Sequence, residues 1–156
     1  MGFLSWLENT SMARWVVESL VAYPAILSLH GIGMAFLVGT LLMYNIRILG
    51  FASGLPITAF NDFMKVAIIG LIVNTITGLL LFAPDANRFL VSVPFITKIA
   101  CIIIGLVLVM VFRRKYLPHI DSWPGGVAPP PVKVLAGLSV IAWLGAIIAG
   151  RLIAYF

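Results

Sequence analysis

The chain has 156 residues, of which 62% are hydrophobic and only 10% charged, and its mean hydropathy is +1.15. Soluble domains carry about 25% charged residues, so the composition excludes an ordinary soluble domain and indicates an integral membrane protein. The net charge of +5 would suggest nucleic-acid binding in a soluble protein. Here we interpret it as the Lys and Arg excess that orients membrane proteins, and we expect no nucleic-acid partner.

The first residues predict structure at the membrane surface rather than a span. The apolar residues Phe3, Leu4, Trp6 and Leu7 stand beside the polar residues Ser5 and Glu8, which is typical of a short helix lying in the interface. Residues 9–11, Asn-Thr-Ser, are good N-cap residues and predict a second helical start.

Four apolar runs follow, at about residues 20–44, 57–82, 90–112 and 132–154. Each is long enough for a helix to cross a hydrocarbon core of about 30 Å, which takes about 20 residues. We therefore expect an all-α fold, an integral membrane four-helix bundle with a short N-terminal interfacial helix. The whole chain would form a single transmembrane domain.

Basic residues predict the orientation of this bundle. One side carries Arg47, Arg113, Arg114, Lys115 and Lys133, and the other side carries Arg14, Arg88 and Arg151. The positive-inside rule then places both termini outside the cytoplasm. We expect a multi-pass protein of the bacterial inner membrane with both termini periplasmic. The Pro- and Gly-rich residues 118–131 predict an extended cytoplasmic connection.

Small residues at four-residue spacing predict where the helices meet. Gly31, Ala35 and Gly39 form one ridge in the first span, and Gly145 and Ala149 form another in the fourth. Such ridges allow close helix contact in membranes. The contact could lie within a tight bundle or between the copies of a homo-oligomer.

Three polar residues on three different spans fall at similar depth. From the helical rise of about 1.5 Å per residue, His30 lies about 16 Å deep, Asn74 about 15 Å and Lys98 about 12 Å from the outer ends of their spans. Ionisable groups at membrane depth are costly, which makes His30 and Lys98 the first candidates for a functional site.

Further residues are candidates for the same outward-facing pocket. Thr77 lies one turn from Asn74, Trp143 of the fourth span falls near the same level, and Arg151 shares its helical face. The alternatives are a Lys98 that only snorkels to the interface, and a neutral His30 bonded to a neighbouring helix. Asn74 and Thr77 could equally be hydrogen-bond links between helices.

His30 is also the candidate metal or haem ligand. The other histidine, His119, lies on the opposite side, which excludes bis-histidine haem ligation within one chain. A single-histidine haem b site or a copper site at His30 and Met34 stays open. Cys101 is the one cysteine and excludes a Cys-based zinc site. The sequence leaves the cofactor unknown.

Four motifs carry a resemblance to a known family: residues 45–50 (NIRILG), 77–82 (TGLLLF), 94–98 (PFITK) and 149–155 (AGRLIAY). Together with His30 and Gly31 they resemble a family of small bacterial four-helix membrane proteins of unknown function, distantly similar to the copper-resistance D membrane domain. The family often has Asp where this chain has Asn45, beside Arg47. The resemblance implies a bacterial inner-membrane protein with a periplasmic metal or redox partner.

We therefore predict a non-enzymatic inner-membrane subunit that anchors or serves a redox or metal-handling partner on the periplasmic side. Its expected partners are membrane lipids and other protein subunits, or further copies of itself. Two alternatives stay open. One is an electron-transfer subunit that binds haem b or a quinone, and the other is a transporter of small solutes or metal ions. Internal carboxylates, usual in proton and cation transporters, are missing.

Overall fold

The computed structural model describes the whole chain except residues 1, 52–53, 55–62, 124–125 and 156. The described part is helical and contains no strand. Its four long helices are α3 (Ala22–Leu49), α4 (Phe63–Phe82), α6 (Val93–Val111) and α7 (Pro130–Leu152). All four are long and apolar enough to cross a membrane, which confirms the expected all-α membrane bundle.

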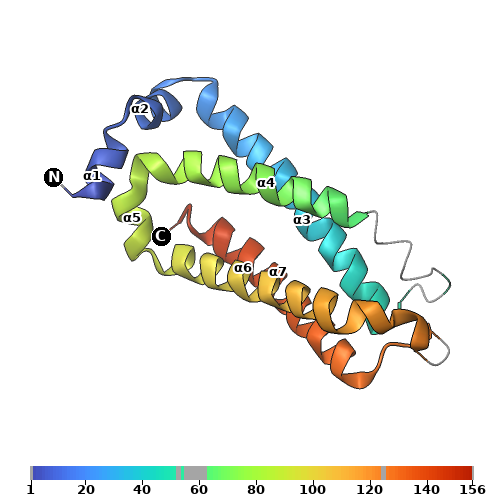
Figure 1. Cartoon of the computed structure of the whole chain (residues 1–156). Helices are drawn as coiled ribbons and strands as arrows, with labels where there is room; N and C mark the ends of the chain where they lie inside the picture. Colours follow the sequence, from blue (N-terminus) through green and yellow to red (C-terminus); the bar gives the residue numbers. More distant parts are fainter. Residues whose placement is uncertain (1, 52–53, 55–62, 124–125, 156) are drawn as a thin grey trace.

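The four helices pair as two hairpins. α3 packs along α4, α6 packs along α7, and contacts between α3 and α7 join the two hairpins. Both termini lie at one end of the bundle, which we call the terminal side, and the opposite end we call the loop side (Figure 1). An even number of spans requires this arrangement.

The terminal side is covered by short helices, α1 (Phe3–Glu8), α2 (Ser11–Glu18) and α5 (Ala86–Val91), with the 3₁₀ turn η2 (Ala83–Asp85) before α5. Thr10 caps α2 by accepting a hydrogen bond from the backbone N–H of Ala13, as its N-cap position predicts. The carboxylate of Glu8 accepts two hydrogen bonds from Asn87, one from its backbone and one from its side chain, each of 2.8 Å. These bonds tie α1 to α5.

The spans differ from the expected ranges at their ends. The first runs on to Leu49, and Gly50 closes it with a φ of 111°, a backbone conformation that glycine adopts at low cost. Leu90 and Val91 belong to α5 rather than to the third span, because Ser92 is extended and Pro94 begins a new helix. The expected start of the second span, residues 57–62, lies outside the described residues.

The loop side contains more helical structure than the sequence predicted. A π-helical turn, η3 (Phe112–Tyr116), and a 3₁₀ helix, η4 (Leu117–Ser122), follow α6. Trp123 then lies 8% exposed in a cluster with Tyr44, Ile48 and Phe112. The expectation of an extended connection was wrong for residues 118–122, because burial of this indole folds the chain back against the helix ends.

A different pair of glycines from the one predicted makes the closest helix contact. A Cβ atom on Gly70 of α4 would lie 2.7 Å from both the carbonyl oxygen of Gly33 and the amide nitrogen of Leu37. Gly31 and Gly39 of the predicted ridge have nothing within 4 Å of their Cβ positions, so that ridge does not pack within the chain. On α7, the ridge does meet α6, since a Cβ on Gly145 would lie 3.1 Å from the sulfur of Cys101.

Candidate functional site

The structure brings His30, Thr77, Asn74 and Lys98 together in one cluster between α3, α4 and α6. The ring nitrogen Nδ1 of His30 lies 2.9 Å from Oγ1 of Thr77, and Nε2 lies 3.5 Å from Nζ of Lys98. Asn74 donates a hydrogen bond of 2.8 Å to the backbone carbonyl of His30. We call these four residues the polar cluster. All four are buried or half-buried, so none of them projects into lipid as a free surface residue.

The hydrogen bonds of the polar cluster run consistently in one direction. A protonated Lys98 can only donate, so we infer that Nε2 of His30 accepts from it and that the ring proton sits on Nδ1. Nδ1–H donates to Oγ1 of Thr77, whose own hydroxyl donates 2.7 Å away to the carbonyl oxygen of Val73. This chain of hydrogen bonds uses both ring nitrogens and favours one imidazole tautomer.

Two glycines that sequence reasoning did not single out give the cluster its space. A Cβ on Gly78 would lie 3.3 Å from Cε1 of His30, and one on Gly150 would lie 3.3 Å from Cδ of Lys98. A side chain at either position would press on the imidazole or on the lysine stem. Both glycines occur in the quoted motifs, directly after Thr77 and directly before Arg151, but spacing alone gave no reason to choose them.

Three other predicted site residues lie outside the cluster. Trp143 is 1% exposed and packs against Gly105 of α6 in the central core. Met34 packs against the same core. The side chain of Arg151 is exposed, although its neighbour Gly150 contacts Lys98. The depth argument was wrong for Trp143, because Gly150 is the α7 residue beside Lys98, while Trp143 lies beside Gly105, about 10 Å further along α6. Nor could depth give the direction of each side chain around its helix.

The cluster offers little to a metal ion in this arrangement. The described residues contain no group of three or more His, Cys, Asp or Glu that could hold one. An imidazole nitrogen binds a metal at about 2 Å, and the space beyond Nε2 of His30 is taken by Lys98. An iron or copper ion at His30 would have to displace Lys98, so the haem b and copper assignments stay predictions.

The hydroxyl of Thr77 is expected to stabilise the fold. In Thr77→Val, the proton on Nδ1 of His30 loses its acceptor, and the free energy of unfolding should fall by about 1 kcal/mol. Thr75→Val is the matched control, because exposed Thr75 bonds only within its own helix, to the carbonyl of Leu71. Thermal unfolding in detergent compares the two variants, and equal melting temperatures would contradict the bond between Thr77 and His30.

Fold and cluster together define a four-span helical membrane protein with a histidine and a lysine in contact between its helices. Comparison with protein-family models, with curated proteins and with solved structures gave no match. The resemblance to the copper-resistance D membrane domain therefore stays a prediction, and the function is argued from the residues alone.

Proposed function

We propose that this chain is a non-enzymatic subunit of the bacterial inner membrane that anchors a redox or metal-handling partner on the periplasmic side. The observation that supports this most is the unbalanced charge of the polar cluster. Among the described residues, the Lys98 ammonium has one polar contact, with the imidazole of His30, and no carboxylate lies within ion-pair distance of it.

The position of this charge favours a partner that comes from the terminal side. Lys98 lies five residues into α6, about 8 Å along the helix axis from Val93. Its stem is long enough to direct the ammonium toward that end of the bundle. A carboxylate of a partner, or an acidic group of the partner's cofactor, would form a charge-assisted hydrogen bond there, and such bonds are about twice as strong as neutral ones.

Helix α2 offers a surface for the same partner. Ala13 and Val16 are fully buried against the bundle, while Arg14 and Glu18 are exposed and line a shallow hollow on the outer face of the helix. An amphipathic helix anchored in this way presents polar side chains to water at the membrane surface. The terminal side therefore combines an exposed polar face with a cationic group beneath it.

In-cell photo-cross-linking tests the proposed function. A photoreactive residue at Glu18 in the native host should capture a protein that holds haem or a metal ion. The same residue at Val134, which is 62% exposed on α7 near the loop side, should capture only lipid. Cross-links to lipid or to the chain itself at both positions would overturn the proposal.

The proposed orientation makes a separate prediction. In a Cys101→Ser background, Ser122→Cys on the loop side should resist a membrane-impermeant maleimide in intact cells, because the basic loop faces the cytoplasm. Ser11→Cys on α2 is exposed on the terminal side and should react. Labelling of Ser122→Cys with protection of Ser11→Cys would reverse the orientation and move the partner to the cytoplasm.

A further inference from the structure

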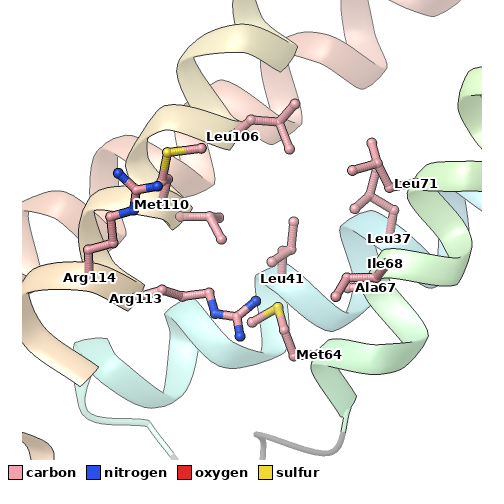
Figure 2. Close-up of a pocket in the computed structure, with 11 residues that line it drawn as sticks. Leu37, Leu41, Met64, Ala67, Ile68, Leu71, Leu106, Met110, Arg113 and Arg114 are labelled. Carbon is pink, nitrogen blue, oxygen red and sulfur yellow. The ribbon is translucent and has the colours of Figure 1, made fainter. Parts of the chain in front are cut away.

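A groove lies between α4 and α6 in the loop-side half of the bundle, far along both helices from the terminal side. Its volume is about 610 Å³, and nine of its eleven lining residues are apolar. Leu37 and Leu41 of α3 form its floor, Leu71 lies on the α4 wall, and Leu106 lies on the α6 wall (Figure 2). The groove exists because α4 and α6 belong to different hairpins, each packed along its own partner.

Two arginines provide the polar part of this groove. Arg113 and Arg114 follow directly after the apolar span of α6 and belong to the π-helical turn η3. Figure 2 shows Arg113 directed across the groove toward Met64 of α4. Within the described part of the chain, no carboxylate forms an ion pair with either guanidinium. π-Helical turns are often found at functional sites.

The dimensions of the groove favour a lipid chain over a helix. From Leu106 to Arg113 the rise is about 10 Å, which is less than the half-thickness of the hydrocarbon core, about 15 Å. The groove therefore lies within one leaflet. A volume of about 610 Å³ is in the range of small-molecule sites and is too small for a membrane-spanning helix.

We propose that this groove binds one anionic phospholipid of the leaflet on the loop side. The phosphate accepts hydrogen bonds from Arg113 and Arg114 at the membrane boundary, and an acyl chain lies between α4 and α6 above Leu37 and Leu41. Guanidinium groups suit phosphate geometry particularly well. Basic pockets between membrane helices on the cytoplasmic side bind acidic head groups in the same manner.

Native mass spectrometry of the detergent-purified chain tests the head-group contact. Added phosphatidylglycerol should bind about tenfold more tightly than phosphatidylcholine with the same acyl chains, a difference of about 1.4 kcal/mol. The double variant Arg113→Gln/Arg114→Gln should lose this preference. The control Lys115→Gln/Lys133→Gln removes the same charge from the loop side outside the groove and should keep it.

A second pair of variants tests the acyl-chain contact. Ile68→Trp places an indole on the groove wall and should reduce binding of both lipids, while Ile69→Trp, at the next and more exposed position, should not. The proposal is overturned if phosphatidylglycerol binding survives Ile68→Trp, if inorganic phosphate displaces the lipid, or if both lipids bind equally well to the unmodified chain. A second copy of the chain that occupied the groove would also overturn it.

Discussion

Gly70→Ala is expected to destabilise the protein more than Gly78→Ala, the same change at the other glycine of α4. The new Cβ would lie 2.7 Å from the backbone of α3 at two atoms, and backbone cannot move aside as a flexible side chain can. The two helices must separate, at a cost of about 3 kcal/mol. For a chain of this size, that corresponds to a melting temperature lower by about 10 °C.

Gly39→Ala is the matched control for this prediction. Its Cβ meets nothing within 4 Å, and alanine is the better helix former, so its melting temperature should equal or exceed that of the unmodified protein. Unfolding in detergent, followed by circular dichroism, compares the variants. If Gly70→Ala were as stable as Gly39→Ala, α3 and α4 would not cross at Gly33 and Gly70.

Lys98→Met is expected to release the partner while the bundle stays folded. Methionine keeps most of the apolar stem that lies beside Gly150, but it removes the charge offered to the partner's acidic group. Loss of a hydrogen bond to a charged group costs about 1.5–3 kcal/mol. The amount of co-purified partner should therefore fall at least about tenfold.

Arg151→Met tests whether partner binding depends on Lys98 itself or on any positive charge at the terminal side. Arg151 is exposed and is not part of the polar cluster, so its replacement should leave the partner bound. Co-purification from the native host in mild detergent, with the melting temperature of each variant, provides the comparison. Equal loss of the partner in both variants would mean that Lys98 acts only as one of several surface charges.

Hydropathy was sufficient to predict the number of spans and the class of fold, because crossing a bilayer demands about 20 apolar residues whatever the packing. The same regular rise along each helix gave the level of His30, Asn74 and Lys98, and the structure joins these three residues in one cluster. Depth follows from the rise per residue and from the start of the span, so an error of three residues in the start of α6 changed the depth of Lys98 by only about 4.5 Å.

The direction in which each side chain points around its helix could not be predicted in the same way. α3 and α4 are apolar on nearly every face, so no polar stripe distinguishes the packed face from the lipid-facing one. The ridge of Gly31 and Gly39 was therefore as plausible as the contact at Gly33 and Gly70. The groove beside Arg113 depends on the angle between the two hairpins, and no local pattern of residues predicts that angle.

The absorption spectrum of the protein, purified from its native host before and after its partner is removed, tests the proposed anchoring function most directly. We predict haem or metal absorption in the intact complex and its complete loss, with the partner, from the isolated chain, because Lys98 lies next to the Nε2 atom of His30 where a ligand bond would form. A Soret band that stays with the isolated chain would contradict the account and make the chain itself the haem-binding subunit.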